Sequence, residues 1–273
     1  MASAGKRVGA VTFDLWQTLL LERDGASGRR SSARCSSVAG TLNRFGLAVS
    51  AEQVNVAMKE IVDSLVKVWD SNRDVSHLEQ LRLIVKHVSN GSVALKDEWV
   101  DELSAAYVSA FQEVQPYLNP GAEEVLQHLK REGRQVGLIC NTGLTPGFSL
   151  RSFLEQSGIA ECFDVMVFSD EVGVRKPDAR IFQITARRLK TDPWEIVHVG
   201  DNLKADVWGA ENAGFKTIYF AGEEGRDSLA EADPTSLVAL SRGLGTLKKE
   251  EIVPDKTIRH FNMLMGAIKE LEM

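Results

Sequence analysis

Several side chains able to do chemistry stand directly after short apolar runs of this sequence. Asp14 follows the run 8–13, with Thr18 four residues later, and Asp201 follows the run 195–199 and a glycine. Because the carboxyl ends of parallel strands meet at one edge of an open sheet, we expect the polar groups that follow such runs to converge there. The full set is Asp14, Thr18, Asn141, Thr142, Lys176, Asp201 and Asp206.

Three carboxylates in this set would repel one another once the sheet brings them together. Each pair at about 4 Å costs roughly 4 kcal/mol at an effective dielectric constant of 20, so the cluster of Asp14, Asp201 and Asp206 needs a cation. Carboxylate oxygens and waters suit Mg²⁺, which takes one or two protein carboxylates and then oxygens of a substrate phosphate. The sequence therefore predicts Mg²⁺ as a cofactor.

A second, fixed positive charge is available from Lys176. Its ammonium can hold the Asp14 carboxylate ionised and steady the oxygens of a phosphate group. Neutral donors are offered by Thr18 and by Asn141 and Thr142, which follow the apolar run 135–140. The groups predicted at this edge of the sheet could therefore bind phosphate oxygens together with Mg²⁺.

The apolar runs themselves predict a doubly wound α/β fold. Short runs rich in β-branched residues are typical of strands buried on both faces of a parallel sheet. Helical patterns occupy 121–131 and 178–189 between them, and this alternation is typical of a parallel, Rossmann-like sheet with helices on both faces. The predicted strands are 8–13, 135–140, 164–168, 195–199 and 216–220.

The first and second predicted strands are separated by a long stretch with helical periodicity only. Ser50 with Gln53, and Ser76 with Glu79, have the spacing of a capping box and predict two helix starts. A further helix is predicted from Ser32 to Phe45, and a last one before residue 115. The stretch is thus predicted to be an inserted helical bundle.

Two linkers delimit this insertion. Residues 22–32 are rich in Gly, Ser and Arg, and residues 115–120 contain two prolines. We therefore expect a core domain of residues 1–21 and 116–273 and a helical domain of residues 22–115, with a hinge between them. Near the end of the chain, residues 222–234 are predicted to be a surface loop and 258–271 a helix.

Composition restricts the class of partner. The chain of 273 residues carries 32 Lys and Arg against 38 Asp and Glu, a net charge of −6, which argues against nucleic acid. Its 3 cysteines are too few and scattered for a disulfide framework. The sequence has no apolar stretch long enough to span a membrane. We expect a cytoplasmic protein, a monomer or homodimer, acting on a small molecule.

Three motifs, in order, resemble those of the haloacid dehalogenase-like superfamily. They are FDLWQTLL around Asp14, FSDEVGVRKPDARIF with Lys176, and VGDNLKADVWGAENAG with Asp201 and Asp206. The resemblance implies a hydrolase, most often of phosphate monoesters, and the helical insertion is similar to the cap that closes over the substrate in this family.

The resemblance also implies roles for individual residues. Asp14 corresponds to the nucleophile, which would form an aspartyl-phosphate, and Lys176 to the lysine of the third motif. Mg²⁺ would be held by Asp14, Asp201 and the backbone carbonyl of Trp16. Asp206 would bind the metal or orient its waters.

Two positions depart from the family pattern. Trp16 stands where most phosphatases of the family have an aspartate that acts as general acid and base, and indole cannot transfer that proton. Cys140 stands where a serine or threonine usually ends the second strand, and Thr142 is the alternative phosphate contact. Three functions therefore stay open: a phosphatase of a small phosphorylated metabolite, a protein that binds a phosphorylated ligand with weak or no catalysis, and a metal-free hydrolytic dehalogenase.

Overall fold

A parallel sheet forms the centre of the computed structural model, which describes residues 7–222 and 252–273. Its 6 strands lie in the order β5-β4-β1-β6-β7-β8, and each neighbouring pair is parallel. The five strands predicted from the sequence are all present, and β8 is an additional edge strand. The strands are β1 Ala10–Phe13, β4 Gln135–Cys140, β5 Val165–Phe168, β6 Ile196–Gly200, β7 Lys216–Phe220 and β8 Lys256–Ile258.

Helices cover both faces of this sheet, as the doubly wound fold requires. One face packs on α5 (Ala122–Arg131), α6 (Gly147–Gln156) and α12 (Leu264–Glu272), and the other on α8 (Ala179–Leu189) and α9 (Gly209–Asn212). All residues of β1 and β6 are buried, which explains why these runs are mostly apolar instead of alternating with exposed polar residues. The α/β fold predicted from the sequence is therefore confirmed.

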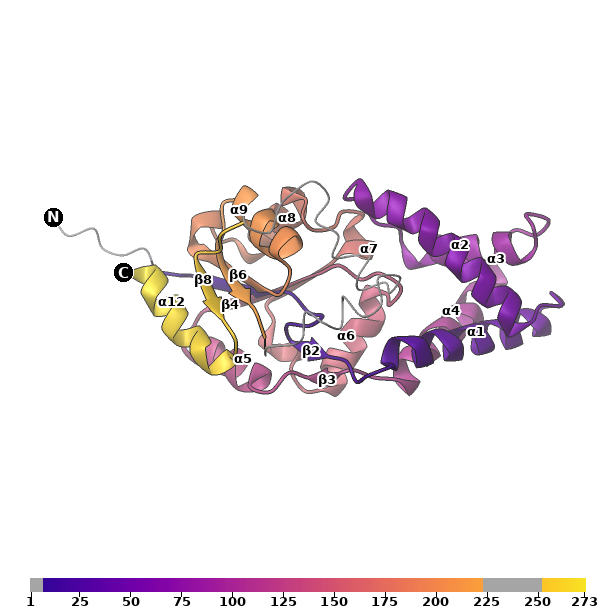
Figure 1. Ribbon diagram of the computed structural model, residues 1–273, viewed down its shortest axis with the longest axis horizontal. Helices are drawn as coiled ribbons and strands as arrows, with labels where there is room; N and C mark the ends of the chain where they lie inside the picture. Colours follow the sequence, from indigo (N-terminus) through magenta and orange to yellow (C-terminus); the bar gives the residue numbers. More distant parts are fainter. Residues whose placement is uncertain (1–6, 223–251) are drawn as a thin grey trace.

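A helical insertion, consisting of α1 to α4 between residues 26 and 113, follows β1 and has its own hydrophobic core (Figure 1). The large side chains of this core include Leu42, Leu65 and Tyr107, all fully buried or nearly so. α1 packs mainly against α4 and α2. The helices are α1 Ala26–Arg44, α2 Ala51–Asp70, α3 His77–Val88 and α4 Val100–Glu113.

Both predicted helix starts are present, but only one capping box is complete. Ser50 Oγ accepts from Gln53 N at 3.1 Å, and Gln53 Oε1 accepts from Ser50 N at 2.8 Å. Ser76 Oγ accepts from Glu79 N at 3.3 Å, whereas the Glu79 carboxylate pairs with Arg82 at 3.4 Å. The predicted box at Ser76 is therefore a simple N-cap, because an arginine one turn later competes for the glutamate.

The linker predicted at 22–32 is wrong over most of its length. α1 begins at Ala26, after Gly25 in the left-handed conformation at φ 69°. Arg30 donates from Nε and Nη2 to Val114 O at 3.1 and 2.9 Å, and from Nη1 to Glu22 Oε1 at 2.6 Å. These contacts with residues outside the helix stabilise its first turns, although their glycine and serine content disfavours a helix.

The end of the chain also differs from the expectation. The helix predicted at 258–271 begins later, because Ile258 belongs to β8 and a 3₁₀ turn at Phe261–Met263 precedes α12. The loop predicted at 222–234 lies, apart from Gly222, outside the described residues. No helix in the described ranges is long and apolar enough to cross a membrane.

The two connections between the sheet and the helical insertion run side by side. β2 (Leu20–Leu21) pairs antiparallel with β3 (Tyr117–Leu118). Asn119 Nδ2 donates to Thr18 O at 2.7 Å, and Asn119 N donates to Leu19 O at 2.9 Å. The outgoing and returning chains are therefore held together directly beyond β1, next to Asp14.

The difference between the two caps gives a prediction about stability. Replacement of Ser50 by Ala removes the acceptor of a complete capping box and is expected to lower the free energy of unfolding by about 1 kcal/mol. Ser76→Ala should cost less, because the hydrogen bond that it removes is longer, 3.3 Å against 3.1 Å, and belongs to no capping box. Ser64→Ala, an exposed site inside α2, is the control and should cost nothing. Urea unfolding followed by circular dichroism checks this, and equal losses at Ser50 and Ser76 would contradict it.

Candidate active site

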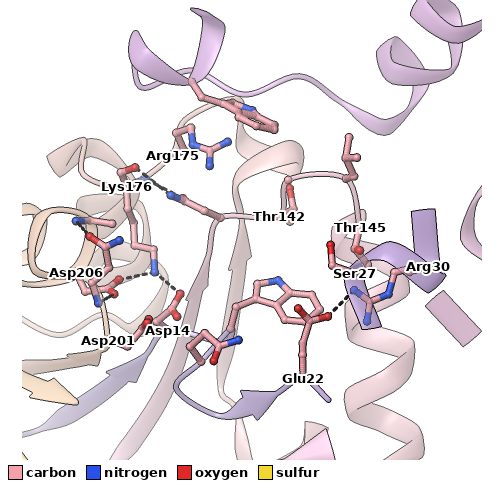
Figure 2. Close-up of a pocket in the computed structure, with 18 of the residues that line it drawn as sticks. Asp14, Glu22, Ser27, Arg30, Thr142, Thr145, Arg175, Lys176, Asp201 and Asp206 are labelled. Atoms are coloured by element: carbon pink, nitrogen blue, oxygen red, sulfur yellow. Dashed lines mark hydrogen bonds and ion pairs between the residues drawn. The ribbon is translucent and has the colours of Figure 1, made fainter. Parts of the chain in front are cut away.

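A cavity of about 170 Å³ lies between the carboxyl edge of the sheet and helix α1 (Figure 2). Asp14 extends from the end of β1, Asp201 from the end of β6, and Lys176 from the loop that follows α7 (Ser169–Val172). Every site residue predicted from the sequence lines this cavity except Thr18. Those that line it are Asp14, Trp16, Asn141, Thr142, Lys176, Asp201 and Asp206.

The ammonium group of Lys176 lies between two buried carboxylates (Figure 2). Lys176 Nζ is 2.5 Å from Asp14 Oδ1 and 2.6 Å from Asp206 Oδ1. Burial by itself would lower the pKa of Lys176, but attraction to these two carboxylates outweighs it and raises the pKa above its usual value. Lys176 is therefore a permanent cation.

The two carboxylates differ in their protonation behaviour. Burial raises the pKa of Asp14 to about 6, against the opposing attraction of Lys176 and with a further increase from Asp206. Burial acts on Asp206 in the same direction, but Lys176 and His198 outweigh it and hold its pKa below the usual range. At neutral pH, Asp206 is thus the firmly ionised member of the pair.

His198 positions Asp206 from inside β6. Its Nε2 lies 3.3 Å from Asp206 Oδ1 and its Nδ1 lies 2.9 Å from the Thr12 hydroxyl. Burial lowers the pKa of His198, so the ring is neutral and we assign the proton to Nε2. The sequence did not single out His198, because the five histidines of the chain show no spacing typical of metal ligands. Its position two residues before Gly200 could have indicated the role, because residues two apart in a strand lie on the same face.

The carboxylates present suit a hard divalent cation. One oxygen of each of Asp14, Asp201 and Asp206 lies within 4.8 Å of the others. Both oxygens of Asp206 already accept hydrogen bonds, Oδ1 from Lys176 and Oδ2 from Asn202 N at 2.9 Å. Protein groups thus hold both oxygens of Asp206, and three carboxylates against one lysine leave negative charge for a cation to balance.

Asn141 and Thr142 differ in what their side chains contact. The Asn141 amide donates to Lys176 O at 3.0 Å and accepts from Lys176 N at 2.9 Å, so it fixes the backbone that carries the lysine. Thr142 N donates to Ser169 Oγ at 2.9 Å. The Thr142 hydroxyl also lies 3.3 Å from Ser169 Oγ, so both side chains contact the protein, and both residues line the cavity.

The structure places three further residues at different depths around the cavity: Trp16, Thr18 and Cys140. Trp16 forms a wall of the cavity and packs edge to face on Phe111, with ring centroids 6.2 Å apart. Thr18 is fully buried behind Asp14, and its hydroxyl is 3.5 Å from Asp14 Oδ2, a long hydrogen bond. Cys140 is fully buried in the hydrophobic core, and burial raises its pKa well above the ordinary value. Thr142, not Cys140, therefore faces the cavity.

A buried polar network beside the cavity was not predicted. Asp74, which follows α2, accepts from Trp69 Nε1 at 2.9 Å, from Ser169 Oγ at 2.5 Å and from Arg175 Nη1 at 3.2 Å. The Arg175 guanidinium also lies 4.5 Å from the Trp69 ring centroid. The network joins the helical insertion to the residue that precedes Lys176, and the third motif contains two of its members, Ser169 and Arg175, whereas nothing in the sequence pointed to Asp74.

Comparison with known proteins places the chain in a family. A family model described as haloacid dehalogenase-like hydrolase matches residues 8–214. The chain is 29% identical to a glyceraldehyde 3-phosphate phosphatase of Pyrococcus furiosus over 79% of this chain and 81% of the relative. It is 36% identical to a ribulose-1,5-bisphosphate 5-phosphatase of Halopiger xanaduensis over 48% of this chain and 53% of the relative. That second match thus spans about half the length of the relative.

Solved structures give the same fold. A 2-haloacid dehalogenase from Pseudomonas syringae pv. Tomato superposes with a TM-score of 0.65 at 20% identity, covering 96% of this chain and 99% of the other. A phosphatase from Thermococcus onnurineus superposes with a TM-score of 0.56 at 22% identity, covering 94% and 96%. At these identities the likeness establishes the fold and leaves the choice of substrate to the residues of the cavity.

The raised pKa of Asp14 gives a prediction about metal affinity. A divalent cation binds the ionised carboxylate, so binding must displace the proton that Asp14 holds below pH 6. We expect Mg²⁺ affinity to fall about tenfold from pH 7.5 to pH 5. Titration calorimetry at both values measures this. Asp14→Asn should bind more weakly and lose this pH dependence, and a wild-type affinity that stays constant would contradict the assignment.

Proposed function

Because the chain belongs to the haloacid dehalogenase-like hydrolases, we propose that it is a Mg²⁺-dependent phosphatase of a small phosphorylated metabolite. The observation that carries the proposal is the placement of Lys176 between Asp14 and Asp206, with Asp201 beside them, at one end of the cavity. Relatives named as phosphatases of small sugar phosphates support the same class of substrate.

In the proposed reaction, an oxygen of Asp14 attacks phosphorus and the bond to the ester oxygen breaks. The alcohol leaves, and an aspartyl-phosphate remains on Asp14. Water then attacks this acyl phosphate, which releases inorganic phosphate and restores the carboxylate. Splitting the hydrolysis into two displacements suits a site in which positioning and charge stabilisation do most of the work.

The residues around Asp14 prepare it for attack. Lys176 holds Oδ1, which fixes the orientation of the carboxylate, and the Thr18 hydroxyl lies 3.5 Å from Oδ2. The same ammonium would neutralise charge on the phosphoryl oxygens in the transition state. Mg²⁺ held by Asp14, Asp201 and the Trp16 carbonyl would supply further charge neutralisation at those oxygens.

Trp16 affects which leaving groups the proposed reaction can use. Its indole lies on the cavity wall against Phe111 and 5.7 Å from the Arg30 guanidinium carbon, so it contributes a surface and no titratable proton. The alcohol must therefore leave with less protonation than in relatives with an aspartate at this position. We propose that the enzyme favours esters of acidic alcohols over those of simple aliphatic ones.

We also propose that residues 22–115 act as a cap over the active site. Ser27, Arg30 and Ser31 of α1 line the cavity opposite Asp14, so the helical insertion supplies one wall of the site (Figure 2). The paired strands β2 and β3 are the only covalent connections between this insertion and the sheet, which makes them the hinge for any opening.

Hydrolysis of p-nitrophenyl phosphate tests the proposal, because its leaving group needs little protonation. We expect turnover with Mg²⁺, none with EDTA, and a loss of at least about 1000-fold in Asp14→Asn, which removes the attacking oxygen. Asp63→Asn, an exposed carboxylate on α2, is the matched control and should keep full activity. Metal-dependent activity that survives in Asp14→Asn would rule out the assigned nucleophile.

Two other outcomes would identify the alternatives. Release of halide from a 2-haloacid in the presence of EDTA would indicate a metal-free dehalogenase. The aromatic residue Trp16 beside the nucleophile favours this alternative, and the acidic residues Asp201 and Asp206 argue against it. Tight binding of phosphate esters without turnover would indicate a phospholigand-binding protein. The first outcome contradicts the proposed phosphatase function in a halide-release assay, and the second contradicts it in a binding assay.

A further inference from the structure

Helix α1 presents a polar stripe to the cavity. Ser27, Arg30, Ser31 and Arg34 follow the spacing of one helix face, and all four line the cavity. In Figure 2 the labelled members Ser27 and Arg30 lie across the cavity from Asp14 and Lys176. The stripe is therefore placed to meet the part of a substrate that is remote from its reacting phosphate.

Among the cations that line this cavity, three have carboxylate partners. Lys176 pairs with Asp14 and Asp206, Arg175 pairs with Asp74, and Arg30 pairs with Glu22. Arg30 also spends two donors on Val114 O, so each of its three guanidinium nitrogens already donates to a protein group.

Arg34 has no carboxylate partner among residues 7–222 and 252–273. It is 4% exposed, and within those residues its one hydrogen bond runs from Nε to Tyr107 O at 3.4 Å. The guanidinium carbon lies 4.5 Å from the Tyr107 ring centroid. A guanidinium has five N–H donors, so the four on Nη1 and Nη2 meet no protein acceptor in the described ranges.

The side chains behind Arg34 hold it in place. Tyr107 donates its hydroxyl to Gln80 Oε1 at 2.9 Å, and Gln80 Nε2 donates to Gly143 O at 3.1 Å, in the loop after β4. The ring on which Arg34 stacks is thereby fixed to the edge of the sheet. A buried cation with a fixed stem and unused donors on the cavity side is a site prepared for an anion.

We propose that the substrate is a phosphate monoester with a second anionic group, which Arg34 binds through Nη1 and Nη2. This inference rests on the proposed phosphatase function and names its substrate class. The reacting phosphate lies at Asp14 and Lys176, and the second anion, a carboxylate or another phosphate, lies against α1 beside the hydroxyls of Ser27 and Ser31. The size of the cavity limits the carbon frame between them to that of a small metabolite.

Matched substrates test this. 3-Phosphoglycerate and glycerol 3-phosphate share a three-carbon frame and differ in a carboxylate against a hydroxymethyl group. Ribulose 1,5-bisphosphate and ribulose 5-phosphate differ in a second phosphate. For at least one pair, wild-type kcat/KM should favour the member with the second anion by roughly 10- to 100-fold, as expected for a charge-assisted hydrogen bond. The pair with the larger ratio identifies the second anion as carboxylate or phosphate.

Variants assign the preference to Arg34. Arg34→Gln should reduce the ratio to about one, and Arg34→Lys should keep part of it because the charge remains. Arg44→Gln, on the exposed surface of the same helix, is the control and should leave the ratio unchanged. A wild-type enzyme without preference in either pair overturns the proposal, and so does a loss in Arg34→Gln that is equal for both members of each pair.

A binding measurement separates this proposal from the proposed function. If p-nitrophenyl phosphate and all four esters resist hydrolysis, the phosphatase assignment fails, and calorimetry with the same esters then decides the role of Arg34. Tighter binding of the doubly anionic esters that is lost in Arg34→Gln supports the anion site. Equal binding within both pairs overturns it. Thermal melting of each variant confirms that it is folded.

Discussion

The site depends on the burial of one ammonium group between two carboxylates. Without Lys176, Asp14 and Asp206 would face each other as like charges in a site from which water is largely excluded. The surrounding structure fixes this arrangement from both sides. Asn141 binds the backbone of Lys176, while His198 and the backbone of Asn202 hold Asp206.

The order of the strands makes this arrangement possible. β1 lies between β4 and β6, so the residues that follow these three strands share one edge of the sheet. Asp14 N donates to Val199 O at 2.9 Å, which sets the nucleophile candidate beside the end of β6. Gly200 is required there, because a Cβ at this position would lie 2.3 Å from Asp206 Cγ. A side chain at residue 200 would displace the carboxylate that Lys176 needs.

The sequence predicted the structure correctly where a local pattern of apolar residues determines the element that forms. Strands buried on both faces appear as unbroken apolar runs, so the sheet and the residues at its edge could be predicted. The roles of Arg30 and Asp74 could not be predicted, because their contacts with Val114, Ser169 and Arg175 join residues 84, 95 and 101 positions apart and leave no periodic signal. The glycines and serines of 22–32 indicated a linker, whereas contacts with Glu22 and Val114 make the segment helical. β8 was missed because it is a short edge strand with one buried residue.

Helix α1 is divided along its length between two tasks. Its first turns, from Ser27 to Arg34, line the cavity, whereas Cys35, Val38 and Leu42 belong to the hydrophobic core of the helical insertion. Changes at the exposed serines Ser27 and Ser31 therefore alter what the cavity admits while the packing that keeps the insertion folded is untouched. Such a division makes the protein evolvable, because selection for a new substrate can act on these two positions of one helix without first having to compensate a loss of stability.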